Sequence, residues 1–146
     1  ARVAEFYAGV GAIGLSLLPR VREIRMNEVS PHSLQGMALG IAALDAADRA
    51  KVEVVQGLAG EAIAAASGAD VVIADPPRRG LDRGLLEYLG QQPPELFLYV
   101  SCGLESLLED TARLTSSGKL RLSGLTAFNL IPFTEHVETV ARFERA

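Results

Sequence analysis

The sequence predicts a doubly wound α/β fold, and three observations carry this prediction. Short runs rich in β-branched and other apolar residues alternate with longer runs rich in alanine and leucine, in the order βαβαβαβαβα. The short runs are apolar almost throughout, as expected for parallel strands with helices on both faces. The length of 146 residues suits one domain around one core.

The expected elements follow in chain order. Val, Ile, Leu, Phe and Tyr concentrate in five expected strands, at residues 3–7, 23–28, 52–56, 70–75 and 96–101. Ala, Leu, Glu and Gln favour five expected helices, at residues 12–18, 30–44, 60–66, 83–89 and 104–115. Ser30 and Pro31 form an N-cap and first-turn pair for the second helix. The pairs Pro76-Pro77 and Pro93-Pro94 mark loops.

The pattern changes after Lys119. Residues 120–130 and 135–144 are two extended stretches with no helix between them, joined by Ile131-Pro132-Phe133-Thr134. This arrangement predicts an antiparallel hairpin at the end of the chain.

Composition limits the possible partners. The net charge of −4 offers no general attraction to a polyanion, so an RNA partner would be held by a local patch or by segments outside this chain. Charged residues interrupt each apolar run before it is long enough for a membrane span. The single cysteine excludes an internal disulfide. We expect a monomeric, cytoplasmic domain that spans residues 1–146 as a fragment of a longer chain and binds no metal.

The first strand leads into a glycine-rich turn, EFYAGVGAIGL. Gly9 and Gly11 allow the backbone to turn sharply and approach a ligand. Glu28 follows about twenty residues later, where an acidic side chain binds ribose hydroxyls in nucleotide-binding sheets. The alternatives are an ordinary turn and a helix-terminal charge, and the string also fits a dinucleotide dehydrogenase.

Asp75 ends the fourth strand, in ADPPRRGL. Asp or Asn followed by two prolines and an aromatic residue is typical of enzymes that methylate exocyclic amino groups, where the aromatic ring stacks on the base. Arg78 stands at the aromatic position here, which argues against an exocyclic nitrogen as the target.

Cys102 and Glu138 are the candidate catalytic residues. Cys102 follows the fifth strand and precedes a helix whose amino end favours a thiolate, although most free cysteines are inert core residues. Glu138 shares one strand face with His136 and Val140 and is a candidate base. Its alternative interpretation is an edge-strand charge that opposes aggregation.

In combination, FYAGVGAIGLSL, ADPPRRGL, LYVSCGLESLLED and IPFTEHVETVARFER resemble the catalytic domain of the RNA uracil-5-methyltransferase family over essentially all 146 residues. The resemblance implies a Rossmann-like methyltransferase fold, S-adenosyl-L-methionine as cofactor and a tRNA or rRNA substrate.

The resemblance also implies a role for each site residue. The Cys102 thiol would add to carbon 6 of uracil, and Glu138 would remove the proton from carbon 5. The cofactor would be bound by Tyr7, Gly9, Gly11, Ala12, Glu28 and Asp75.

The sequence departs from the family pattern at several positions. Glu5 stands where Asp is usual, Ala8 where Cys is usual, and Phe133 where His is usual. Gly103-Leu104 replaces Asn-Pro after the cysteine. The end of the third strand, Gly57-Leu58-Ala59, lacks the acidic residue that many methyltransferases direct at adenine. Two alternatives stay open: a methyltransferase with another target atom, such as one in cytosine, and a non-catalytic domain that binds RNA or a partner.

Overall fold

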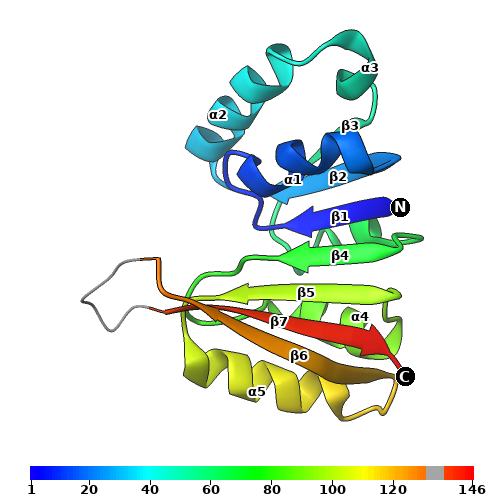
Figure 1. Ribbon diagram of the computed structural model, residues 1–146, viewed down its shortest axis with the longest axis vertical. Helices are drawn as coiled ribbons and strands as arrows, with labels where there is room; N and C mark the ends of the chain where they lie inside the picture. Colours follow the sequence, from blue (N-terminus) through cyan, green and yellow to red (C-terminus); the bar gives the residue numbers. More distant parts are fainter. Residues whose placement is uncertain (131–136) are drawn as a thin grey trace.

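The computed structural model describes residues 1–130 and 137–146 and confirms the α/β class (Figure 1). Within these residues, seven strands form one sheet in the order β3-β2-β1-β4-β5-β7-β6. The strands are β1 (Arg2–Phe6), β2 (Glu23–Glu28), β3 (Val52–Gln56), β4 (Val71–Ala74), β5 (Leu96–Ser101), β6 (Leu120–Phe128) and β7 (Glu138–Arg145). Strands β1 to β5 run parallel, as predicted, because a helical or 3-10 crossover follows each of them.

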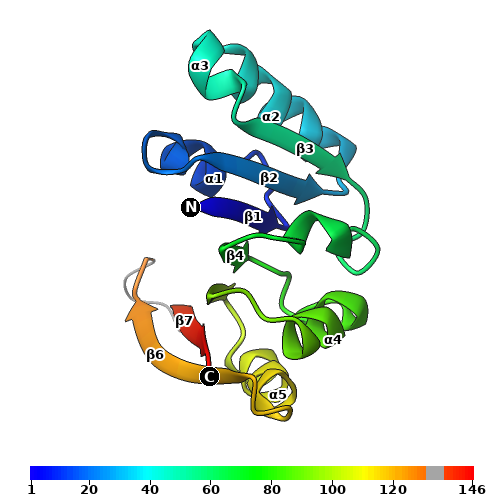
Figure 2. The same cartoon turned by 90° about the vertical axis from the view of Figure 1, so that its right-hand side faces the viewer.

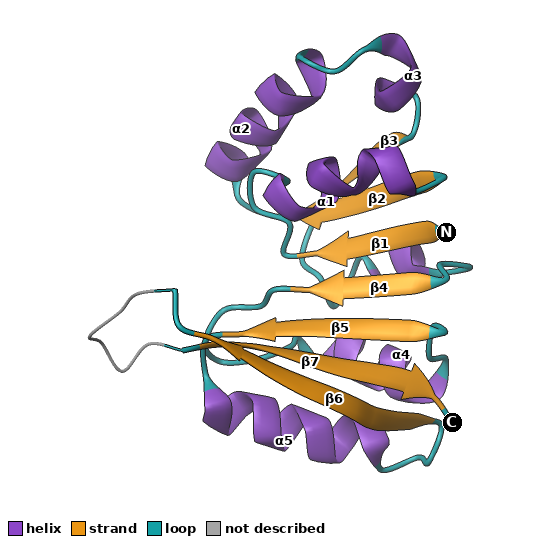
Figure 3. Cartoon of the chain, viewed as in Figure 1, coloured by secondary structure: helices purple, strands orange, loops and turns teal. Residues whose placement is uncertain are grey.

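Helices cover both faces of the sheet (Figures 2 and 3). They are α1 (Ala12–Leu17), η1 (Leu18–Arg20), α2 (Pro31–Ala42), α3 (Ala46–Arg49), η2 (Ile63–Ala66), α4 (Arg83–Gln91) and α5 (Leu104–Thr115). Side chains of α1 and α2 pack with one buried cluster and those of α4 and α5 with the other. Within the part of the chain that the structure describes, no helix combines the length and the apolar character that crossing a bilayer requires.

Two expected elements differ from the structure. The alanine-rich segment 60–66 forms only the 3-10 turn η2, because turn bonds from the amides of Glu61 and Ala62 to the carbonyl of Leu58 occupy its beginning. The one-turn helix α3 was not predicted, although Asp45 caps it by accepting a hydrogen bond from the amide of Asp48 at 2.8 Å. A single turn is too short to produce a periodic signal.

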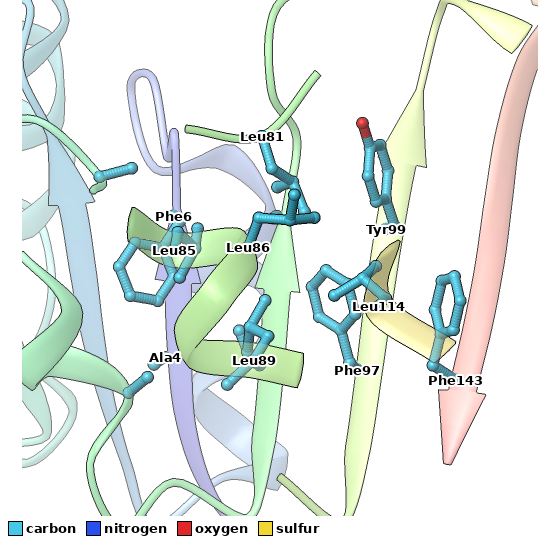
Figure 4. Close-up of a cluster of buried hydrophobic side chains, with 14 of the residues drawn as sticks. Ala4, Phe6, Leu81, Leu85, Leu86, Leu89, Phe97, Tyr99, Leu114 and Phe143 are labelled. Carbon is cyan, nitrogen blue, oxygen red and sulfur yellow. The ribbon is translucent and has the colours of Figure 1, made fainter. Parts of the chain in front are cut away.

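The larger buried cluster lies between the sheet and helices α4 and α5. In Figure 4, Leu85 lies over Phe6, and Leu81 and Leu86 lie between Phe6 and Tyr99 of β5. The rings of Phe97 and Phe143 stack with centroids 5.6 Å apart, so the terminal hairpin is packed into the core.

The hairpin is confirmed, but its second strand is not an edge. Strand β7 lies between β5 and β6 and pairs antiparallel with both, which leaves β6 at the sheet's edge. The interpretation of Glu138 as an edge-strand charge is therefore wrong. The predicted connection 131–134, the family departure at Phe133 and the predicted orientation of His136 lie outside the described residues.

Candidate active site

Most of the predicted site residues lie at or just after the carboxyl ends of the parallel strands, and Glu138 is the first residue of the antiparallel strand β7. Phe6 of β1 pairs with Asn27 of β2 and with Ala74 of β4, and Ala74 pairs with Tyr99 of β5. The residues that come next in the chain therefore meet along the carboxyl ends of the strands. Strand order reverses between β1 and β4, and this is the position at which ligands bind in such sheets.

The turn after β1 has an unusual backbone. Tyr7, Gly9 and Gly11 have φ values of +59°, +58° and +82°. Glycine adopts this region freely, whereas for Tyr7 it costs on the order of 1–3 kcal/mol. The Tyr7 hydroxyl accepts a hydrogen bond from the amide of Asp82 at 2.8 Å, and burial raises the pKa of Tyr7 to about 12. The strained tyrosine thus ties the β1 turn to the start of α4.

Glu28 organises two loops with one carboxylate. Its Oε2 accepts a hydrogen bond from the amide of Gly9 at 2.7 Å. Its Oε1 accepts from the amides of Val29 and Ser30 at 2.8 and 2.7 Å. Ser30 is the N-cap of α2, so the Glu28 carboxylate lies at the amino end of that helix. The alternative interpretation of Glu28, a negative charge that stabilises a helix amino end, therefore also fits the structure. A carboxylate has about four acceptor positions, so one on Oε2 stays available to a ligand hydroxyl.

Asn27 is a structural site residue that the sequence did not reveal. Its side-chain amide donates to the carbonyl oxygens of Val55 and Gly57 at 3.0 and 2.9 Å, and only 1% of the residue is exposed. These bonds hold the end of β3 beside the end of β2. A polar residue near the end of an otherwise buried strand is the signal that identifies it.

A cavity of about 300 Å³ lies beyond these strand ends. It is lined by Tyr7, Asn27, Glu28, Val29, Gly57, Leu58, Ala59, Asp75, Pro77, Arg79 and Asp82. Three predicted cofactor residues, Tyr7, Glu28 and Asp75, are thus brought together. The other three predicted cofactor residues, Gly9, Gly11 and Ala12, do not line the cavity. Gly9 and Gly11 lie in the turn after β1, and Ala12 is the first residue of α1.

A larger cavity, about 560 Å³, lies at the opposite end of the sheet. Lys119 and Arg145 supply its charged side chains, and they already donate to the backbone carbonyls of Gln91, the last residue of α4, and of Pro93, in the loop that precedes β5. The smaller cavity is the better candidate, because its carboxylates follow strand ends at the switch point.

Cys102 and Glu138 are brought near each other by the pairing of β5 with β7. Ser101, the last residue of β5, pairs antiparallel with Thr139, and Cys102 and Glu138 are the chain neighbours of this pair at the same end of the two strands. Cys102 is exposed and Glu138 is half-buried. The Ser101 hydroxyl accepts a hydrogen bond from the amide of Gly103 at 3.1 Å, which holds the turn that carries the thiol.

Asp75 is electrostatically coupled to this pair. Partial desolvation at the strand ends, and next the nearby Glu138 carboxylate, raise the pKa of Asp75. Asp75 therefore lies between the cavity, which it lines, and the Cys102 and Glu138 end of the sheet. Such a position suits a residue that contacts both of two reacting molecules.

Asp110 of α5 holds the loop between β4 and α4 in place. It is the second structural residue of the site, after Asn27, that the sequence did not reveal. Asp110 is 7% exposed, and its Oδ2 accepts from the Tyr99 hydroxyl at 2.8 Å and from the amide of Leu81 at 2.9 Å. Burial, and next the hydrogen bond to Asp110, raise the pKa of Tyr99. The loop after Asp75 is thus attached to β5 and α5.

Sequence comparisons find relatives of this chain among RNA methyltransferases. An RNA methyltransferase of Protochlamydia amoebophila is 39% identical over 145 residues, which cover 99% of this chain and 38% of that protein. The tRNA (uracil(54)-C(5))-methyltransferase of Pyrococcus horikoshii is 30% identical over 141 residues, or 97% of this chain and 32% of that protein. The chain thus spans about a third of the length of these relatives.

A solved structure gives the same result for the fold. The tRNA (uracil-54, C5)-methyltransferase of Pyrococcus abyssi, solved in complex with S-adenosyl-L-homocysteine, superposes with a TM-score of 0.77 and 26% identity over 97% of this chain and 33% of that one. The model of the tRNA (Uracil-5-)-methyltransferase family matches residues 66–146, more than half of the chain. The matched segment runs from the end of η2 through Asp75 and Cys102 to the last strand, and the chain belongs to this family.

Proposed function

We propose that the protein transfers a methyl group from S-adenosyl-L-methionine to carbon 5 of a uridine in tRNA or rRNA. The observation that carries the proposal is the pairing of Ser101 with Thr139, because it supports an approach of Cys102 to Glu138 at the end of the sheet where Asp75 borders the cavity. Membership of the family supports the reaction class. The nucleophile, the base and the target atom are our assignments.

The residues around the cavity fit this cofactor. Glu28 retains one acceptor position for a ribose hydroxyl. No atom lies within 4 Å of the position that a Cβ atom at Gly9 would occupy, so a ligand has room there. Gly11 has a φ of +82°, which favours glycine, and a methyl group there would lie 3.3 Å from side-chain atoms of Met26 and Met37, so the turn packs closely on both. Tyr7 and Asp75 line the same cavity as Glu28. When bound, S-adenosyl-L-methionine supplies an electrophilic methyl carbon.

Carbon 5 of uracil is a weak nucleophile, and the protein residues have to activate it. The Cys102 thiolate adds to carbon 6 and forms a sulfur–carbon bond, which leaves an enolate that is nucleophilic at carbon 5. Once carbon 5 carries the methyl group, the Glu138 carboxylate removes its proton. The electron pair of that carbon–hydrogen bond restores the ring double bond, and the thiolate leaves.

The RNA partner requires more than this chain's charge provides. The net charge of −4 gives no general attraction for phosphates. We infer that RNA is held by further parts of a longer protein, as the relatives' greater length suggests. The basic pair Arg78-Arg79 lies in the loop after Asp75 and is the local patch closest in sequence to the site.

A proton-release assay tests the proposal. RNA with tritium at carbon 5 of uridine should release tritium to water as methyl transfer proceeds, because Glu138 removes that hydrogen after carbon 5 is methylated. Glu138→Gln should slow the release by about 10²- to 10⁴-fold. Methyl transfer without release from uridine would point to another atom, and release from cytidine-labelled RNA would point to cytosine. Cofactor and RNA binding without methyl transfer would support the non-catalytic alternative.

A further inference from the structure

Asp82 occupies the N-cap position of α4, yet its carboxylate does not cap the helix. The equivalent side chains of Ser30 and Asp45 each accept a hydrogen bond from the amide three residues later. Asp82 instead makes two long contacts, at 3.3 Å to the amide of Gly60 and at 3.3 Å to the guanidinium of Arg79. Asp82 thus lacks the capping hydrogen bond that would stabilise α4, as expected for a side chain that serves a binding site.

The carboxylate of Asp82 lies at one end of the candidate cavity and Glu28 at the other. The segment 57–60 connects them, because the amide of Gly57 donates to the carbonyl of Glu28 at 3.0 Å and the amide of Gly60 contacts Asp82. A segment of this length spans at most about 10 Å. The side chain of Asp82 is 20% exposed and lines the cavity, so a ligand held at Glu28 extends toward it.

The other polar side chains along this path are already engaged. Both donors of the Asn27 amide are bonded to β3 and the turn after it, and Glu28 accepts three backbone hydrogen bonds. Asp75 lies toward Glu138. At the end of β3, where an acidic residue is absent, Leu58 is 45% exposed. Among the described residues of the lining, Asp82 is the residue whose side-chain carboxylate accepts from an amide of segment 57–60, that of Gly60.

We propose that Asp82 accepts a hydrogen bond from the exocyclic amino group of the donor's adenine, and this inference rests on the proposed function. A ribose hydroxyl at Glu28 directs the base along segment 57–60, past the exposed apolar side chains of Val29 and Leu58. The amino group donates and a carboxylate only accepts, so the pair is matched. Hypoxanthine carries an oxo group in place of this amino group. The oxo oxygen and the Asp82 carboxylate are both acceptors, so they form no hydrogen bond and hypoxanthine binds more weakly.

The test compares two ligands by calorimetry, S-adenosylhomocysteine and its analogue with hypoxanthine in place of adenine. The wild-type protein should bind the adenine form about 10- to 100-fold more tightly, because the hydrogen bond involves a charged acceptor. Asp82→Asn should lower this ratio to about threefold or less, or invert it, because its amide donates to the oxo group. Asp82→Ala should also lose the preference, while its thermal melting reports whether the chain is folded.

The matched control is Asp45→Asn, the same substitution at a helix N-cap far from the cavity, which should keep the wild-type ratio. An unchanged ratio in Asp82→Asn or in folded Asp82→Ala would overturn the assignment of Asp82. Equal wild-type binding of both ligands would also overturn it and leave the proposed function standing. Binding of neither ligand by the wild-type protein would contradict the proposed function itself.

Discussion

Glu5 is a buried carboxyl group inside the first parallel strand. It is 2% exposed, and its Oε2 has no hydrogen-bond partner among the described residues. Burial raises the pKa of Glu5 to about 7, a hydrogen bond with the backbone of Gly14 lowers it, and the Asp75 charge raises it. The folded protein therefore holds the proton on Glu5 more tightly than the unfolded chain does.

This shift predicts a pH-dependent stability. A pKa raised from 4.5 to about 7 means that the stabilisation from protonated Glu5 is complete below about pH 4.5 and is lost as the pH rises through 7. Glu5→Gln removes that loss, so the variant should exceed the wild type in free energy of unfolding at pH 8 by up to about 3 kcal/mol. Urea unfolding at pH 5 and pH 8 measures the difference. A variant that is equally destabilised at both pH values would contradict the assigned titration.

Glu28, Asp75 and Cys102 were predicted as site residues because they lie at or just after strand ends, which are visible in the local pattern. Asn27 was missed because it bonds backbone carbonyls 28 and 30 positions away. Asp110 was missed because it bonds the amide of Leu81, 29 positions away, and the hydroxyl of Tyr99, 11 positions away. No local pattern reports such a contact.

At the scale of elements, the start of α4 depends on a close approach to the turn after β3. A methyl group on Gly84 would overlap the backbone carbonyl of Gly60. The same substitution at Gly90, in the same helix, would meet nothing closer than 3.9 Å. The two glycines therefore separate the effect of packing from that of helix propensity.

We expect Gly84→Ala to destabilise the protein by about 1–3 kcal/mol, because one backbone segment has to move. Gly90→Ala should stabilise it by about 0.5–1 kcal/mol, since alanine favours a helix interior. Thermal unfolding of both variants measures this contrast. Equal effects of the two substitutions would show that α4 does not pack on Gly60 as described.

The elements themselves were largely predictable. Strands β2, β3 and β5 and helix α5 have the predicted bounds, because their apolar patterns and flanking polar residues are strong. The segment 60–66 shows the limit of propensity, since an alanine-rich sequence forms only a 3-10 turn where the chain is tied to Leu58 and Asp82. Tertiary contacts override helix propensity at that point.

At the scale of the whole molecule, the order of the strands creates the site. The sequence predicts parallel strands and a final hairpin, but not that β7 inserts between β5 and β6. That insertion pairs Thr139 with Ser101 and so brings Glu138, from the last strand, near Cys102, 36 positions earlier in the sequence. The pairing of β7 with β5 depends on long-range contacts such as the stacking of Phe97 on Phe143. The proposed reaction centre thus depends on the complete sheet.

The most direct test of the account is covalent capture on RNA that contains 5-fluorouridine. In the presence of S-adenosyl-L-methionine the protein should form a complex that survives a denaturing gel, because fluorine leaves no carbon-5 proton for Glu138 to remove. Cys102→Ala should form no such complex while cofactor binding persists. A complex of unchanged yield in Cys102→Ala, or none in a wild-type protein that methylates the unmodified RNA, would contradict the account.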